Sequence, residues 1–336
     1  MISLLASLKS ILWINRRSEN DVVNLYNSIT PFVRIALADV NNNTMLNFGY
    51  WDESTTGHLA AQIELCRLVG EFAELQSATK IIDIGSGFCS SAAIWKYIYD
   101  NKILDIVCVD INLKQLIAAM EKMTTYSTNP LNRSDLFYNN IENLNIEVCK
   151  RTKSKDSVLP LVNATATTLP FADNCVDRII ALESAQHFKP LSKFLRESKR
   201  VLTSEGLLVV AIPVLGPSFH NQSLIQQLAK LRILYFTWAS EHYSLERIKS
   251  EIITEGFQIR DIKHIGHHVY EPCADYYIQN RWVLRQRLKT NAFSYASSLF
   301  IGLVEKIVYI SALKMKDSSQ KGIIDYVLIR AAPTSS

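Results

Sequence analysis

The stretch KIIDIGSG, residues 80–87, joins a short apolar run to a glycine turn, and it decides the fold of this chain. The apolar run predicts a buried strand, and helical apolar spacing follows the turn over residues 92–98. A strand, a tight turn and a helix N-terminus leave backbone N–H groups free to face a ligand. Glycine lets the backbone pass close to that ligand because it has no Cβ.

Strands and helices alternate on the C-terminal side of this turn. Further strands are predicted at 103–109, 158–162, 176–182, 207–213, 257–265 and 323–330. Helices are predicted at 113–123, 190–202 and 245–255, the second of them closed by Ser204-Glu205-Gly206. This order is typical of an α/β fold with a Rossmann-like, mostly parallel seven-stranded sheet covered by helices on both faces.

Three parts are expected in the chain. Residues 1–75 read as a helical N-terminal lid segment, residues 76–265 and 322–332 as the Rossmann-like domain, and residues 266–321 as a helical cap inserted before the last strand. The cap is rich in aromatic residues, which suggests that it covers a substrate pocket. Residues 124–157 are polar and interrupt the alternation, which predicts a surface insertion.

Composition limits the classes of partner. The 336-residue chain is 48% hydrophobic with a net charge of only +4, which argues against nucleic acid as the main partner. The six cysteines lack the spacing of a zinc site, and no metal is expected. Residues 1–14 are apolar and read as an amphipathic helix that packs on the domain or lies on a membrane surface. We therefore expect a cytoplasmic protein, with peripheral membrane contact as the alternative.

Asp110 ends the second predicted strand, where a carboxylate can accept hydrogen bonds from both hydroxyls of a ribose. The alternative is an ordinary strand-end acid. A dinucleotide-binding turn would have a third glycine three residues after Gly87, and this chain has Ser90 there. A nicotinamide-dependent dehydrogenase is thus disfavoured.

Two later motifs complete an ordered set with the glycine turn and Asp110. They are NAT at residues 163–165, followed by LPFAD at 169–173, and ALESAQHF at 181–188. Together the four resemble the class I S-adenosylmethionine-dependent methyltransferases, in the branch that holds tocopherol, sterol and natural-product methyltransferases. The resemblance covers residues 45–265 and the last strand, and it implies S-adenosyl-L-methionine as cofactor.

The resemblance implies a role for each of the following residues. The loop around the methionine part is formed by Asp83, Gly85, Ser86 and Gly87; Asp110 holds the ribose; Ile111, Asn163, Ala164 and Thr165 contact the adenine; and Leu182 lies beneath the methionine. The segment NFGYW at 47–51 resembles a lid, so Tyr50 and Trp51 are candidates to face the sulfonium cation. Gln62 is a weaker candidate to bind the methionine carboxylate or amine.

His187 is the first candidate for the catalytic base, because relatives place substrate-facing groups after this strand. Glu183 is the second candidate. Some oxygen-methylating relatives pair the histidine with an acid at the end of the fifth strand, but this chain reads Ala211-Ile212-Pro213 there.

The expected function is methyl transfer to an oxygen or carbon atom of a bulky, apolar small molecule, such as a terpenoid, sterol, quinone or polyketide-like compound. One alternative is an enzyme that keeps the cofactor without methylating, such as a cyclase. Another is a membrane-surface binding protein on the same fold. The acceptor and the oligomeric state stay open.

Overall fold

A computed structural model describes residues 18–37, 45–100, 104–128, 159–219, 243–291 and 298–334. Its centre is a seven-stranded sheet in the order β3-β2-β1-β4-β5-β7-β6, with β7 antiparallel to both of its neighbours. The strands are β1 (Lys80–Ile84), β2 (Asp105–Asp110), β3 (Leu161–Asn163), β4 (Val176–Leu182), β5 (Leu202–Leu215), β6 (Phe257–His264) and β7 (Ile324–Pro333). The predicted α/β fold is confirmed.

The β1 strand lies at the middle of the parallel part of the sheet. Ile82 pairs with Val107 on β2 and with Ile179 on β4. Because parallel strands end at the same edge, this register brings together the glycine turn after β1, Asp110 at the end of β2 and Glu183 after β4.

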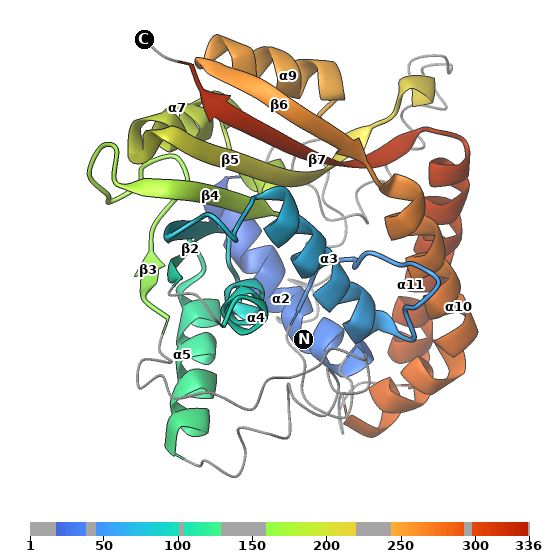
Figure 1. Cartoon of the computed structure of the whole chain (residues 1–336). Helices are drawn as coiled ribbons and strands as arrows, with labels where there is room; N and C mark the ends of the chain where they lie inside the picture. The colour runs from blue at the N-terminus through green and yellow to red at the C-terminus, as the bar shows by residue number, and fades with distance from the viewer. Residues whose placement is uncertain are drawn as a thin grey trace.

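Helices cover both faces of the sheet (Figure 1). One apolar core contains Ile81 and side chains of α3 (His58–Phe72) and α4 (Ser90–Ile98). The other contains Ile82 and side chains of α7 (Leu191–Val201) and α9 (Leu245–Thr254). Successive β1 residues enter opposite cores, as the two-residue period of a strand requires.

Several predicted strand limits are wrong, among them that of β3, which begins at Leu161 rather than at residue 158. The β5 strand begins at Leu202, which pairs with Val176, and the register shifts before Arg178 pairs with Leu207. The residues Ser204-Glu205-Gly206 therefore lie in an irregular part of the strand rather than ending a helix. The last strand continues to Pro333, because its C-terminal end pairs with Phe257 at the start of β6.

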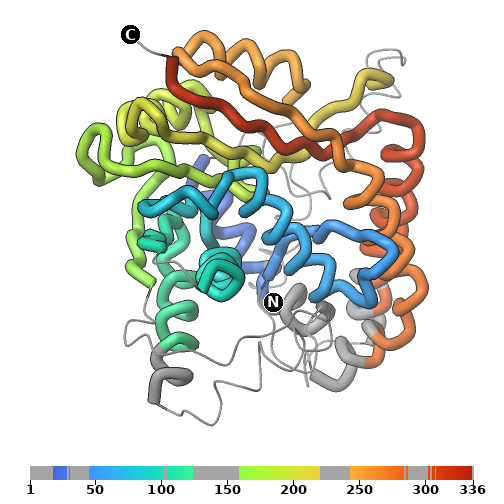
Figure 2. The backbone as a smooth tube through the Cα atoms, in the orientation of Figure 1, coloured from blue at the N-terminus to red at the C-terminus, as the bar shows by residue number. Residues whose placement is uncertain are grey.

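Three further helices surround one end of the sheet. They are α2 (Glu19–Leu37) near the N-terminus, and α10 (Gly266–Asn291) and α11 (Ser298–Gln320) between β6 and β7. Figure 2 shows α10 and α11 side by side as a helical hairpin. The ion pair of Lys316 with Asp275, 2.6 Å, joins the two helices.

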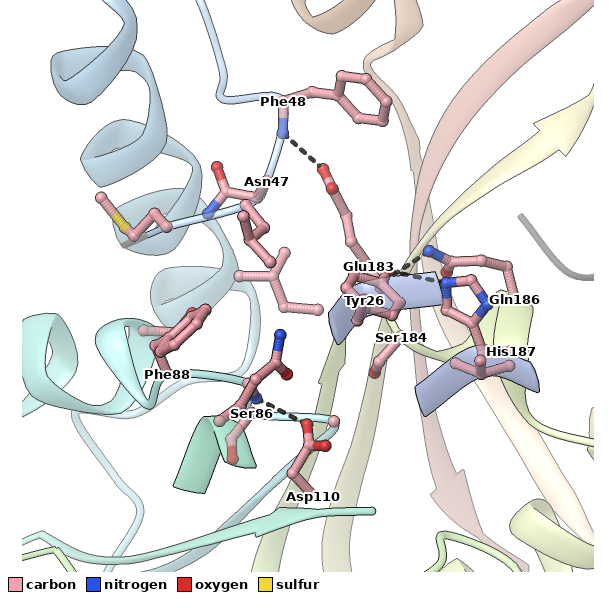
Figure 3. A pocket seen from close by; sticks show the side chains of 18 of the residues that line it. Tyr26, Asn47, Phe48, Ser86, Phe88, Asp110, Glu183, Ser184, Gln186 and His187 are labelled. Atoms are coloured by element: carbon pink, nitrogen blue, oxygen red, sulfur yellow. Dashed lines mark hydrogen bonds between the residues drawn. The ribbon is translucent and has the colours of Figure 1, made fainter. Parts of the chain in front are cut away.

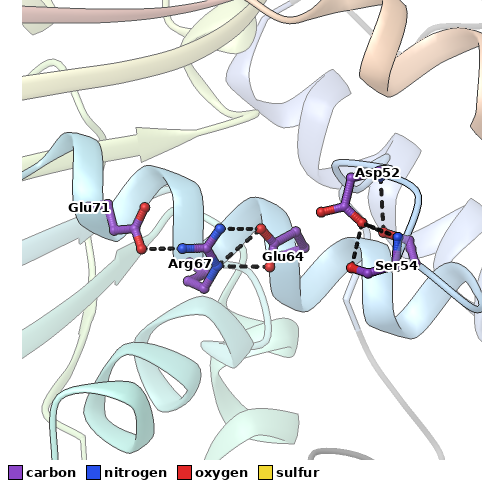
Figure 4. A network of polar contacts seen from close by, with 6 residues as sticks. Asp52, Ser54, Glu64, Arg67 and Glu71 are labelled. Atoms are coloured by element: carbon purple, nitrogen blue, oxygen red, sulfur yellow. Dashed lines mark hydrogen bonds and ion pairs between the residues drawn. The ribbon is translucent and has the colours of Figure 1, made fainter. Parts of the chain in front are cut away.

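The loop before α3 and the helix itself hold local polar contacts (Figure 4). Oδ1 of Asp52 accepts hydrogen bonds from the backbone N–H and the hydroxyl of Ser54, at 2.9 and 2.6 Å. Along α3, Arg67 pairs with Glu64 and Glu71, one turn away on either side. Such pairs each stabilise a helix by about 0.2–0.5 kcal/mol.

Two predicted segments cannot be compared with the structure. The helix at residues 1–14 lies outside the described residues. In the insertion at 124–157, α5 (Leu113–Thr128) extends five residues into the segment, and residues 129–157 are likewise outside. Within the described ranges, no helix combines the length and apolarity needed to cross a membrane.

Candidate active site

A cavity of 310 Å³ lies at the carboxyl ends of β1, β2 and β4. Residues of α2, of the loop 45–48 and of the α10–α11 hairpin form the rest of its wall. This is the edge at which open α/β sheets bind ligands, and the volume falls in the usual range of small-molecule sites.

The glycine turn forms the floor of the cavity. The backbone N–H groups of Gly85 and Ser86 donate to the carbonyl of Val109 at 2.8 and 3.1 Å, which ties the turn to the end of β2. Gly85 has φ +73°, and a Cβ there would lie 2.3 Å from the Cβ of Ser184. Gly87 has φ +56°, with its nearest neighbour 3.6 Å from a built Cβ. Glycine is required at residue 85 by both conformation and space.

Asp110 is buried beside this turn. Its carboxylate accepts hydrogen bonds from the N–H groups of Gly87 and Asn112, both at 2.7 Å. Burial raises its pKa. Each oxygen keeps a further acceptor position, so the side chain can still accept from a diol.

Ile111, Ala164 and Thr165 line the same end of the cavity. Asn163 does not line it: its side-chain amide donates to the carbonyls of Asp110 and Ile111, at 2.9 and 3.0 Å. The residue thus shapes the loop after β2 from behind. The expected adenine contact of Asn163 stays a prediction.

The α2 helix closes over this end. The hydroxyl of Thr165 donates to the carboxylate of Glu19, and Asn112 donates to the side chain of Asn27 at 3.2 Å. Both contacts join the first half of α2 to loops that follow the strands.

Glu183 faces the cavity from the end of β4 (Figure 3). Its φ of +51° is a left-handed conformation that non-glycine residues adopt rarely and at a cost of about 1–3 kcal/mol. Its carboxylate accepts from the backbone N–H of Phe48 at 3.1 Å, and burial raises its pKa to about 8. Strain and a raised carboxyl pKa at one residue are typical of functional sites.

His187 lies one turn further on, and its Nε2 is 2.9 Å from the hydroxyl of Tyr26 (Figure 3). Tyr26 comes from α2 and also lines the cavity. Burial and the charge of Glu183 raise the pKa of Tyr26. Sequence reasoning missed this residue, since no local motif marks it.

Four other predicted residues lie behind the wall rather than on it. Gln62 donates to the carbonyl of Asn47 at 2.8 Å and so fixes the lid loop. Asp83 is buried under the turn, where burial raises its pKa to about 8. Tyr50 packs against His268, 4.8 Å between ring centroids, and Trp51 against Tyr276, 5.2 Å. The aromatic residue of this loop that lines the cavity is Phe48.

The wall suits a cationic methyl donor. Three acids, Glu19, Asp110 and Glu183, line the cavity, and no lysine or arginine does so in the part of the chain that the structure describes. Buried side-chain oxygens of Asn47 and Gln186 have no partner among the described residues. Oxygens of this kind accept hydrogen bonds that a ligand's ammonium or hydroxyl groups supply. The residues present therefore fit S-adenosylmethionine.

Two comparisons of the sequence with known proteins find methyltransferases. A family model described as a methyltransferase domain matches residues 123–210. The erythromycin 3''-O-methyltransferase of Saccharopolyspora erythraea is 24% identical over 298 residues, which cover 85% of this chain and 82% of that protein.

Solved structures share the fold. The cyclopropane synthase MmaA2 from Mycobacterium tuberculosis superposes with a TM-score of 0.69 at 16% identity, covering 94% of this chain and 99% of that one. The [4+2]-cyclase SpnF superposes with a TM-score of 0.63, also at 16% identity, covering 96% and 99%. At these identities, the two likenesses show the architecture alone.

Proposed function

We propose that this chain, a small-molecule methyltransferase that uses S-adenosylmethionine, methylates a hydroxyl oxygen of a bulky, uncharged acceptor. The observation that carries this proposal is the hydrogen bond between Tyr26 and His187 inside the cavity. A hydroxyl acceptor must lose its proton, and this pair supplies a base.

The cofactor, when bound, supplies a methyl group on a positively charged sulfur. Asp110 would accept hydrogen bonds from the ribose hydroxyls, and the turn at Gly85 and Gly87 would admit the methionine part. Ala164 and Thr165 would contact the adenine. Asp83 and Gln62 support these contacts from behind, through the turn and the lid loop.

The proton of the acceptor hydroxyl passes to the oxygen of Tyr26, while the Tyr26 proton passes to Nε2 of His187. The oxygen that remains would form the new bond to the methyl carbon as the carbon–sulfur bond breaks, with S-adenosylhomocysteine as the leaving group. The 2.9 Å contact permits this two-step relay without a group at the end of β5, where relatives can place an acid. The Tyr26–His187 pair thus supplies a base in a chain that lacks that acid.

We assign the acceptor to the part of the cavity that α10 and α11 line, which we call the acceptor lobe. Its wall includes Tyr276, Tyr277, Ala312 and Met315, a mainly apolar and aromatic set. Phosphate and carboxylate groups need cationic or backbone N–H partners, and none of the described wall residues is a lysine or arginine. These features support an uncharged acceptor, and the likeness to an O-methyltransferase supports an oxygen.

A carbon acceptor is the second candidate, and Glu183 favours it. A carboxylate that carries no ion pair in the described structure and faces the cavity can stabilise a developing carbocation or remove its proton.

Labelled methyl donor tests the proposal. The protein is incubated with methyl-labelled S-adenosylmethionine and a panel of macrolide glycosides, sterols and flavonols, and products are identified by mass spectrometry. We expect a labelled methyl ether and one equivalent of S-adenosylhomocysteine. Label found only in protein would contradict the proposal. An acceptor that is converted without formation of S-adenosylhomocysteine would also contradict it and would favour a cyclase. Loss of liposome binding on removal of residues 1–17, with no turnover, would indicate the membrane-surface alternative.

A further inference from the structure

His58 is a buried histidine that the proposed reaction does not use. It is the first residue of α3, its side chain lines the cavity, and it is only 7% exposed. Its Nδ1 is buried and has no hydrogen-bond partner within the described residues. An unpaired buried nitrogen is unfavourable for folding, so no contact within the described residues explains a histidine rather than an apolar side chain here.

The surroundings of His58 place it in the acceptor lobe. Its ring is nearly parallel to that of Tyr276 on α10, with an angle of 19° and 6.1 Å between centroids. The ring of Trp51 lies 6.0 Å away on the lid loop. Tyr276 also lines the cavity, so His58 stands where the lid, α3 and the cap hairpin meet.

The imidazole is neutral at physiological pH. Burial lowers its pKa to about 4, and no carboxylate charge opposes that effect. A neutral imidazole has one donor and one acceptor nitrogen. It therefore suits a hydroxyl or carbonyl group and does not attract an anion.

We propose that His58 determines acceptor specificity by hydrogen-bonding a second, non-reacting hydroxyl or carbonyl group of the acceptor. Trp51 and Tyr276 fix the plane of its ring, and the Tyr26–His187 pair acts on the reacting hydroxyl. The acceptor is accordingly an uncharged molecule with at least two oxygen functions on an apolar frame. This inference rests on the proposed function, which names the reaction at the same cavity.

Two substitutions separate recognition from packing. His58→Phe keeps a ring against Trp51 and Tyr276 and removes the unpaired nitrogen, whereas His58→Asn restores an amide near the position of Nδ1. His264→Phe is the matched control, because His264 lies outside the cavity and its Nδ1 is paired with Asp325 at 2.6 Å. The full chain is used throughout.

Three measurements are made: the melting temperature without acceptor, the Kd for S-adenosylhomocysteine, and the KM and kcat for the member of the panel above with the highest turnover. For His58→Phe we expect a higher melting temperature, an unchanged Kd, and a KM raised about tenfold or more with kcat within about threefold, since about 1.4 kcal/mol corresponds to a factor of ten. His58→Asn should recover part of the KM, and His264→Phe should not raise the melting temperature.

A lower melting temperature for His58→Phe would make the imidazole a structural contact and overturn the inference. An unchanged KM for His58→Phe, or a KM raised equally in His58→Phe and His58→Asn, would overturn it as well. If no panel member is methylated by the wild-type protein, the proposed function fails by itself, and the sign of the melting-temperature change still decides whether His58 is a structural contact.

Discussion

The hydroxyl of Tyr26 and Nε2 of His187 lie 2.9 Å apart although 161 positions separate them in the chain. Tyr26 belongs to α2, which also contacts the loops after β2 and β3 through Asn27 and Glu19. The same helix that closes the cofactor end of the cavity therefore completes the proposed base. In this geometry the proposed base includes a side chain of α2.

Replacing Tyr26 by phenylalanine should lower kcat about 10- to 100-fold and change the affinity for S-adenosylhomocysteine little. The ring remains in the wall, but His187 loses its partner, and positioned proton transfer contributes about 10²–10⁴-fold to a rate. Steady-state kinetics and calorimetry measure the two effects. His187→Ala should lower turnover at least as much.

Asn27→Ala is the control for this substitution, because it removes a different α2 contact and leaves His187 untouched. An equal loss of kcat in Asn27→Ala and Tyr26→Phe would show that only helix docking matters.

Replacing Asp110 by asparagine should weaken cofactor binding by about 1–3 kcal/mol, the scale for lost hydrogen bonds to a charged group. Asp177→Asn is a matched control, since Asp177 also accepts backbone N–H bonds, from Thr79 and Lys80, but does not line the cavity. Isothermal calorimetry with S-adenosylhomocysteine measures both. An unchanged affinity in Asp110→Asn would place the ribose elsewhere.

The affinity for S-adenosylmethionine relative to S-adenosylhomocysteine should rise, by about tenfold or less, between pH 6 and pH 9. Burial raises the pKa of Glu183 to about 8, so its carboxyl is largely protonated at pH 6 and becomes charged across this window. The positive sulfur favours the charged form, and the neutral thioether of the product does not.

Glu183→Gln should remove this pH dependence. Because the variant changes only Glu183, it separates the titration of Glu183 from that of Asp83, whose pKa is raised to about 8 as well. The effect on folding stability has the opposite trend. A carboxyl whose pKa is higher in the folded protein stabilises the fold at pH values below its pKa in the unfolded chain. This stabilisation is lost as pH rises through the folded-state pKa of about 8. The free energy of unfolding of the wild-type apoprotein should thus fall relative to Glu183→Gln from pH 5 to pH 8. A parallel pair of curves would contradict the buried position of Glu183.

Gly85→Ala should destabilise the fold by about 2–5 kcal/mol, and Gly87→Ala by only about 1 kcal/mol. Both residues have positive φ, but only at Gly85 does a Cβ meet a neighbour, Ser184, at 2.3 Å. Chemical denaturation measures the difference. The double variant Gly85→Ala with Ser184→Gly should recover the part of the stability loss that is due to the clash. If nothing is recovered, the whole loss is due to backbone conformation.

The sequence by itself determined the sheet, the glycine turn and the set of residues at the strand ends. Strand and helix periods are local properties, and parallel strands must end at one edge. Gly85, Asp110 and Glu183 could therefore be assigned to one site without coordinates. The same reasoning failed at residues 204–206, where pairing with β4 extends β5 through a sequence that reads locally as a turn.

Only the tertiary structure decided which side chains face the cavity from irregular or distant segments. In the lid loop, Phe48 lines the wall, while Tyr50 and Trp51 pack against the cap, a choice set by contacts with His268 and Tyr276. Tyr26 and His58 lie on helices whose local pattern gives no sign of a ligand. Their proposed roles rest on the meeting of α2 and the α10–α11 hairpin with the strand ends, and such long-range packing leaves no periodic trace in the sequence.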